Sequence, residues 1–177
     1  YFMDMNIIHA TILGIVEGIT EFLPISSTAH LIITSKLLHL SQTEFQKFFE
    51  VFIQSGAILA VVFLYFQYIL KHKYLIKHIV LSFIPTAIIG FLLYKIIKGV
   101  FFDASWLMID AIFFVGLLFL VLEYAIQRKK IVLKHPLSNM SYVQAIVTGL
   151  VQSLAVIPGV SRSGIVMFYL MAQGFKR

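Results

Sequence analysis

Acidic, hydroxyl and imidazole side chains are concentrated in one short segment of a chain that is otherwise apolar. The segment reads EGITEFLPISSTAHL and runs from Glu17 to Leu31. Glu17 and Glu21 are four residues apart, so they share a helix face and repel each other unless a cation or an arginine lies between them. Ser27 offers a nucleophile, and His30, about one turn later, could carry its proton. The segment therefore predicts a reactive site; the alternative for the carboxylates is a solvated helix end.

Hydroxyl groups gather where two new helices are expected to begin. The first group follows Pro24, and the second lies in the motif PGVSRSG. Such hydroxyls either cap the free N–H groups of a helix or join them in an anion site, and both interpretations stay open for each residue alone. The residues concerned are Ser26, Ser27, Thr28, Ser161 and Ser163.

Arg162, in the second motif, has the most specific chemistry of these residues. An arginine within an apolar run requires an anion, and its planar fork suits phosphate. The alternative is a structural ion pair with Glu17 or Glu21. Carboxylates, a histidine, hydroxyls, two helix N-termini and one arginine together predict a phosphate-handling site within a membrane, suited to a lipid phosphate.

The composition is that of an integral membrane protein. Of 177 residues, 60% are hydrophobic and 12% are charged, and the mean hydropathy is +0.94. Three runs are long enough to cross a bilayer: residues 51–70, 76–97 and 105–127, with bounds that are approximate. The first apolar run ends in Pro24 and polar residues rather than at a cleavage site, so we expect the N-terminal segment to be retained.

The net charge of +6 does not indicate a nucleic-acid partner, because the basic residues lie in loops between apolar runs. Lys71, Lys73 and Lys77 follow the first run, and residues 128–134 contain four more after the third run. Two crossings separate these clusters, so both lie on one side of the membrane. The positive-inside rule predicts that this side is the cytoplasm.

The chain contains an internal repeat, with ATILGIVEGITEFLPISSTAH near the start and AIVTGLVQSLAVIPGVSRSG near the end. Three complete crossings lie between the copies, so the second copy is inverted, as in transporters with broken helices. The alternative is chance similarity of two apolar helices. The pairs are Ala10 with Ala145 and Gly14 with Gly149 at a spacing of 135, then, after a one-residue gap, Pro24 with Pro158 and Ser27 with Ser161 at 134.

Each copy begins with two helices too short to cross the membrane. Residues 26–39 would span only about 21 Å as a helix, so a re-entrant hairpin over residues 7–39 is favoured, with the proline near its tip. The second hairpin begins at about residue 140, and the two tips should meet. We thus predict an all-α polytopic membrane protein in which residues 1–177 form one membrane domain. Repeat 1 covers about residues 5–75; repeat 2 is incomplete, so we expect truncation at the C-terminus.

These motifs resemble those of the bacterial integral-membrane undecaprenyl-diphosphate phosphatases, also called bacitracin-resistance phosphatases. The match rests on EGITEFLPISSTAHL and PGVSRSG, with FFEVFIQSGAILAV as weaker support. The resemblance implies hydrolysis of the terminal phosphate of undecaprenyl diphosphate, which recycles the lipid carrier of cell-wall precursors. It also implies a multi-pass protein of the bacterial cytoplasmic (inner) membrane.

The resemblance further assigns roles to residues and partners. It implies catalytic roles for Glu17, Glu21, Ser27, His30 and Arg162, with Ser26, Thr28, Ser161 and Ser163 beside them. It also implies a divalent cation, Mg²⁺ or Ca²⁺, which we expect at Glu17 and Glu21. The expected partners are the polyprenyl diphosphate and membrane lipids, without nucleic acid; a homodimer is left open.

Two points stay open at the level of sequence. Either Ser27 attacks the terminal phosphorus while His30 handles the proton, or Glu21 and His30 position a water that attacks directly. The second function to consider is a lipid-carrier flippase or secondary transporter, because inverted repeats with broken helices are common in transporters. Gln54 could help line the cavity, but we expect it to serve helix contacts instead.

Overall fold

The computed structural model describes residues 4–41, 43–96 and 105–176, and the regular elements in these ranges are all helices. The predicted all-α class is therefore confirmed. The α-helices are α1 (Ile7–Thr20), α2 (Ser27–Leu37), α3 (Glu44–Lys71), α4 (Lys73–Ile96), α5 (Ser105–Gln127), α6 (Tyr142–Gln152) and α7 (Arg162–Ala172), with short 3-10 helices η2 (Leu137–Asn139) and η3 (Ser153–Val156).

Three of these helices, α3, α4 and α5, are long and apolar enough to cross a membrane. They correspond to the three predicted crossings, and the protein is a polytopic membrane protein. α5 matches its predicted range, and the predicted end of the second crossing at residue 97 lies outside the described residues. α3 begins seven residues earlier than predicted, at Glu44. Thr43 caps it there, since its hydroxyl accepts the N–H of Gln46 at 3.1 Å.

The early start of α3 reflects a polar face that turns inward. Gln46, Glu50 and Gln54 follow one another at intervals of four and so share one face of the helix. Gln46 and Glu50 are buried against α2, where Ser35 donates to Glu50 Oε1 at 2.8 Å and Gln46 Nε2 donates to the same oxygen at 3.0 Å. The opposite face is apolar and exposed, as expected for lipid contact.

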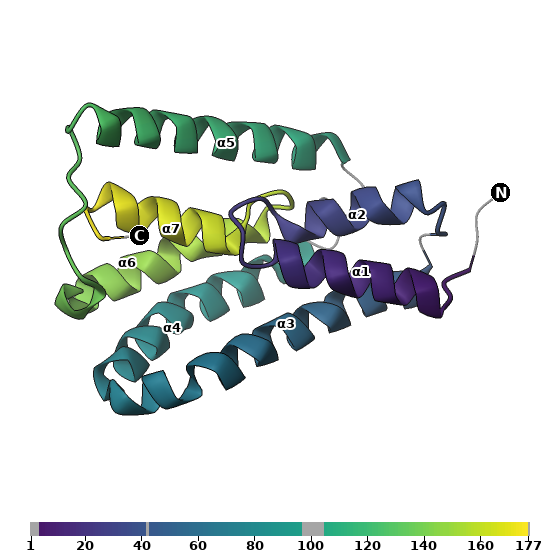
Figure 1. Ribbon diagram of the computed structural model, residues 1–177, viewed down its shortest axis with the longest axis horizontal. Coiled ribbons are helices and arrows are strands. Elements are labelled where there is room, and N and C mark those ends of the chain that lie inside the picture. Colours follow the sequence, from purple (N-terminus) through teal and green to yellow (C-terminus); the bar gives the residue numbers. More distant parts are fainter. Residues whose placement is uncertain (1–3, 42, 97–104, 177) are drawn as a thin grey trace.

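The four short helices form two hairpins, α1 with α2 and α6 with α7. Figure 1 shows the hairpins extending toward opposite ends of the molecule, with their connecting loops meeting near its centre. Pro24 and Pro158 lie in these loops, after the first helix of each pair has ended. We call residues 21–27 the N-terminal tip and residues 157–163 the C-terminal tip.

α2 and α7 are equivalent elements offset by 135 residues. Each has 11 residues and begins after a serine N-cap, Ser26 in one and Ser161 in the other. Each also ends in the same turn, in which His39 (φ 53°) and Gly174 (φ 81°) take a left-handed conformation. In both turns the next residue donates its N–H five residues back, from Leu40 and Phe175. Both of these side chains are buried.

This equivalence changes the pairing inferred from the sequence. The helix boundaries pair Ser27 with Arg162, whereas the sequence comparison paired Ser27 with Ser161. Asn6 and Ser141, also 135 residues apart, each begin the first helix of a hairpin with a capping box. The one-residue difference at the prolines is therefore confined to the loops, and the spacing of 135 holds on both sides of them.

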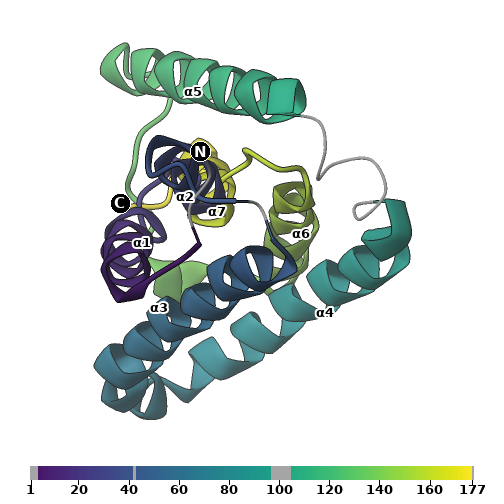
Figure 2. The same cartoon turned by 90° about the vertical axis from the view of Figure 1, so that its right-hand side faces the viewer.

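The hairpins form the middle of the molecule. Figure 2 shows α5 on one side of them and α3 with α4 on the other. The closest helix contact is between α6 and α4, where a Cβ added to Gly149 would lie 1.9 Å from the carbonyl oxygen of Ser82. Thr86 strengthens this contact by donating its hydroxyl to the carbonyl oxygen of Gly149 at 2.8 Å. Only glycine allows this approach.

The basic loops lie at one end of the molecule. The turn between α3 and α4, with Lys71 and Lys73, and the end of α5, with Arg128 and Lys130, are at the same end in Figure 1. The opposite end holds the described N-terminal residues and Glu44, the first residue of α3. This arrangement agrees with the predicted placement of both basic clusters on one side of the membrane.

Candidate active site

The N-terminal tip presents Ser27 at the start of α2 in an unusual backbone conformation. The preceding residue, Ser26, has φ 63° and ψ 93°, and its side chain makes no capping hydrogen bond to α2. A positive φ is uncommon for a residue with a side chain and is found most often where function requires it. The carbonyl oxygen of Ser26 accepts the backbone N–H of His30 at 3.3 Å and its Nδ1–H at 2.9 Å.

Ser27 and Glu21 form the shortest polar contact of the tip. Glu21 is the C-cap of α1 and donates its N–H to the carbonyl oxygen of Glu17 at 2.9 Å, so both carboxylates follow one face of the helix. The hydroxyl of Ser27 donates to Glu21 Oε2 at 2.5 Å. A short hydrogen bond to a carboxylate is among the stronger ones in proteins. It directs the Ser27 proton toward Glu21.

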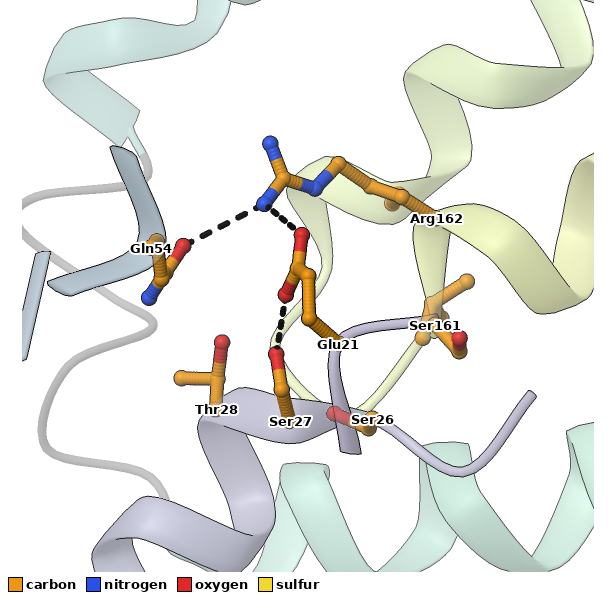
Figure 3. Close-up of a pocket in the computed structure, with 9 residues that line it drawn as sticks. Glu21, Ser26, Ser27, Thr28, Gln54, Ser161 and Arg162 are labelled. Carbon is orange, nitrogen blue, oxygen red and sulfur yellow. Dashed lines mark hydrogen bonds and ion pairs between the residues drawn. The ribbon is translucent and has the colours of Figure 1, made fainter. Parts of the chain in front are cut away.

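Arg162 reaches the same carboxylate from the C-terminal tip. Its Nη2 lies 2.7 Å from Glu21 Oε1 and 3.2 Å from Gln54 Oε1. The Glu21 side chain is only 9% exposed, whereas the Arg162 side chain is 49% exposed. The ion pair that the sequence left as an alternative for Arg162 is therefore formed, and its partner is Glu21. The guanidinium still faces open space (Figure 3).

Serines of the C-terminal tip join the two tips. The hydroxyls of Ser161 and Ser163 donate to the carbonyl oxygen of Leu23, at 3.3 and 3.1 Å. Ser161 also accepts the N–H of Gly164 at 3.1 Å, which is an N-cap bond of α7. A Cβ on Gly164 would lie 3.3 Å from Pro24 Cα, so the tips are in close contact. These hydroxyls therefore cap a helix and hold the tips together.

A polar cavity of about 200 Å³ lies between the tips. It brings together residues from four separate parts of the chain, with Gln54 contributed by α3. Figure 3 shows Glu21 at its centre, between Ser27 and Arg162. The lining residues are Glu21, Ser26, Ser27, Thr28, Gln54, Ala155, Val160, Ser161 and Arg162.

Three residues that the sequence indicated do not line this cavity: Glu17, His30 and Ser163. Within the described part of the chain no hydrogen bond joins Ser27 to His30. Instead the His30 Nδ1 lies against the Ser26 carbonyl, which can only accept, so this nitrogen carries the proton. The carboxylate that contacts Ser27 is Glu21.

Glu17 is the most enclosed acidic residue of the site. It is 1% exposed, and neither of its carboxylate oxygens has a hydrogen-bond partner among the described residues. Buried carboxylates without a partner are rare, because their desolvation is not compensated. Glu17 therefore has unused capacity to bind a cation or a proton.

Gln54 is the lining residue that the sequence analysis did not favour. We expected it to serve helix contacts, but it contacts Arg162 and lines the cavity. The sequence did contain a signal, since Gln46, Glu50 and Gln54 repeat at intervals of four within an apolar helix. That interval places all three on the face that turns away from lipid.

Comparison with known proteins identifies the family. Residues 10–177 match the family model described as bacitracin resistance protein BacA. The chain belongs to this family. The resemblance inferred from the two motifs is thereby confirmed.

Several curated relatives carry the name undecaprenyl-diphosphatase. The protein of Persephonella marina is 50% identical over 163 residues, which cover 90% of this chain and 62% of the relative. That of Campylobacter hominis is 46% identical over 176 residues, which cover 98% of this chain and 67% of the relative. That of Methanococcus aeolicus is 42% identical over 160 residues, which cover 90% and 62%. The chain thus spans about three fifths to two thirds of the length of these relatives.

Proposed function

We propose that the protein hydrolyses the terminal phosphate of undecaprenyl diphosphate, giving undecaprenyl phosphate and inorganic phosphate. The observation that carries this proposal is the double contact of Glu21, which accepts the Ser27 hydroxyl and pairs with Arg162 at one cavity. A nucleophile, a proton acceptor and a phosphate-binding cation are thus within reach of one phosphate group. The name shared by the relatives supports this substrate.

In the first step, the Ser27 oxygen attacks the terminal phosphorus. The Oγ–P bond forms, the bond from phosphorus to the bridging oxygen breaks, and undecaprenyl phosphate leaves. Glu21 accepts the Ser27 proton along the existing 2.5 Å hydrogen bond. Arg162 and the N–H groups at the start of α2 stabilise the charge that develops on the phosphoryl oxygens. The proton acceptor proposed here is Glu21, in place of His30.

In the second step, water attacks the phosphoserine and Glu21 accepts its proton. Ser27 is then released and inorganic phosphate leaves. The competing route, direct attack by a water that Glu21 positions, uses the same residues but forms no bond to Ser27. Single-turnover kinetics with quenching and trapping of a phosphoserine distinguish the two routes.

His30 acts in this proposal through the backbone. Its Nδ1–H holds the Ser26 carbonyl at 2.9 Å, next to the residue with the positive φ. This bond supports the conformation that points Ser27 toward Glu21. His30 is therefore a positioning residue in the proposed reaction.

The divalent cation implied by the family fits the site in one form. The described residues hold no group of three His, Cys, Asp or Glu side chains placed to bind a metal ion. Mg²⁺, however, is commonly held by one or two carboxylates together with substrate phosphates and water. The unpartnered oxygens of Glu17, one turn before Glu21, match that donor set. Glu17 and Glu21 would hold the ion, which would offset the charge of the diphosphate.

We further propose that the basic end of the molecule faces the cytoplasm of a bacterial inner membrane. The N-terminal hairpin would then enter as a re-entrant pair from the outer face and the C-terminal hairpin from the cytoplasmic face. The short lengths of α1, α2, α6 and α7 and the opposite directions of the hairpins support this arrangement. The cavity between the tips would lie at membrane depth.

The function is tested by phosphate release from a polyprenyl diphosphate by protein purified in detergent. Wild type should release phosphate without any membrane gradient, and Ser27→Ala should lose nearly all activity. Ser55→Ala, in which the altered hydroxyl only contacts the Phe52 carbonyl of α3, is the matched control and should retain activity. Absence of release by wild type, together with lipid translocation in vesicles, would favour the flippase or transporter instead.

A further inference from the structure

Gln54 is an amide in the middle of a membrane-crossing helix whose exposed side chains are mostly apolar. It continues the inward face of α3 one turn after Glu50, at the point where that face reaches the cavity. Gln46 and Glu50 are satisfied largely by Ser35, but Gln54 is beyond the reach of that cluster and contacts Arg162 instead. A polar side chain within a crossing is costly unless it has a defined partner.

The contacts of Arg162 limit how it can bind phosphate. Its Nη2 has two N–H groups, and these serve Glu21 Oε1 at 2.7 Å and Gln54 Oε1 at 3.2 Å. A guanidinium binds an oxyanion with two parallel N–H bonds from one edge of its fork. Both edges that can do so, Nε with Nη2 and Nη1 with Nη2, include Nη2. A phosphate bound in this way must therefore displace one of the two existing acceptors.

Gln54 is the acceptor that yields more readily. Its contact is 0.5 Å longer than that of Glu21 and involves a neutral oxygen, whereas the contact of Glu21 is charge-assisted. Glu21 is also held in place by Ser27. Once Gln54 Oε1 has left Arg162, rotation of the amide brings its Nε2–H groups toward the space that the phosphate occupies. The same side chain can thus accept from Arg162 and donate to an anion.

We propose that Gln54 is a phosphate-binding residue of this site: it holds Arg162 in place when the cavity is free and donates Nε2–H to a phosphate oxygen when the cavity is filled. The ligand class is a di- or monophosphate anion, whether free or attached to a lipid. The inference rests on the proposed function for its physiological ligand, but binding of the anion alone is sufficient to test it.

Two near-isosteric substitutions separate donation from simple positioning of Arg162. Gln54→Met removes both the acceptor and the donors while keeping length and flexibility. Gln54→Glu keeps the acceptor for Arg162 but replaces the donors by a negative charge. Gln67 lies on the same helix, is exposed and is not in the cavity, so Gln67→Met and Gln67→Glu are matched controls. Thermal unfolding in detergent monitors the fold of each variant.

The measurement is binding of inorganic pyrophosphate to the purified protein in detergent, by calorimetry and in the presence of Mg²⁺. A hydrogen bond to a charged group corresponds to a change in Kd of about tenfold or more. We expect Gln54→Met to weaken binding by about that factor and Gln54→Glu to weaken it further. The Gln67 variants should bind as wild type does. The KM for the polyprenyl diphosphate should rise in parallel, with a smaller change in kcat.

Equal or tighter binding by Gln54→Glu than by Gln54→Met would overturn the proposal, because an acceptor for Arg162 would then suffice. Wild-type affinity in both variants would also overturn it, as would failure of the wild type to bind pyrophosphate. Failure of the proposed hydrolysis has a different signature, namely pyrophosphate binding that depends on Gln54 without phosphate release from the lipid.

Discussion

Ser27 and Arg162 occupy the same position in the two halves of the molecule. Each is the first residue of an 11-residue helix that begins after a serine, and they are 135 residues apart. Both side chains line one cavity, and both contact Glu21, at 2.5 and 2.7 Å. The internal repeat therefore supplies two equivalent helix starts, and the sequence has given one a nucleophile and the other a cation.

Replacement of Arg162 by lysine tests planar recognition of phosphate. The charge is kept, but an ammonium group cannot make two parallel hydrogen bonds, so we expect kcat/KM for polyprenyl diphosphate to fall by about 100-fold. Arg128→Lys, at an exposed arginine over the Tyr124 ring, is the control and should have little effect. Near-normal turnover of Arg162→Lys would rule out the bidentate contact.

Replacement of Glu21 by glutamine tests its role as proton acceptor. The amide can still accept hydrogen bonds from Ser27 and Arg162, but it cannot take up a proton at neutral pH. We expect kcat to fall by about 10² to 10⁴-fold, measured as phosphate release under saturating substrate. Glu44→Gln at the exposed start of α3 is the control. If Glu21→Gln keeps more than a tenth of wild-type kcat, another group accepts the proton.

Replacement of Glu17 by glutamine tests the cation site. The substitution removes the charge of a buried carboxylate that has no partner among the described residues, while keeping its volume. We expect the Mg²⁺ concentration that gives half-maximal phosphate release to rise by about tenfold or more, and a chelator to abolish wild-type activity. An unchanged Mg²⁺ dependence in Glu17→Gln, with reduced activity, would assign Glu17 a role other than cation binding.

Alanine at two equivalent glycines tests the helix packing. Gly149→Ala places a methyl group 1.9 Å from the Ser82 carbonyl oxygen, so α6 must move away from α4. We expect a loss of stability of about 1–3 kcal/mol, seen as a lower apparent Tm in detergent. Gly14→Ala is the matched control, since no atom lies within 4 Å of its added Cβ. It should be neutral or stabilising by up to about 1 kcal/mol, because alanine favours a helix. Equal Tm values for the two variants would contradict the close contact between α4 and α6.

The chain contains no cysteine, so single cysteines can report which end faces the cytoplasm. Lys73→Cys and Lys130→Cys lie at the basic end, and Glu44→Cys lies at the opposite end. In intact cells, an impermeant thiol reagent should modify Glu44→Cys only. Permeabilised cells, in which all three should react, provide the control. Labelling of the two lysine positions in intact cells would reverse the proposed orientation.

Much of the architecture could be predicted from the sequence because its signals are local. The length of each apolar run decides whether a helix can cross a bilayer, and Pro24 and Pro158 interrupt short helices where the two tips form. The two motifs were sufficient to predict the family. Local patterns also predicted the inverted copies, but the spacing of 134 at the prolines concealed the spacing of 135 that the helices keep.

The tertiary structure decided how the polar side chains are used. Arg162 pairs with Glu21 rather than Glu17, Ser27 contacts Glu21 rather than His30, and Ser163 contacts the opposite tip instead of lining the cavity. Residue type and spacing place these groups near a tip, but they do not fix which donor meets which acceptor. That choice depends on how the two tips pack, within a few tenths of an ångström, because a hydrogen bond requires a donor–acceptor distance near 3 Å. Gln54 joins the site for the same reason: α3 crosses the membrane next to the tips, and only the packing brings its amide to Arg162.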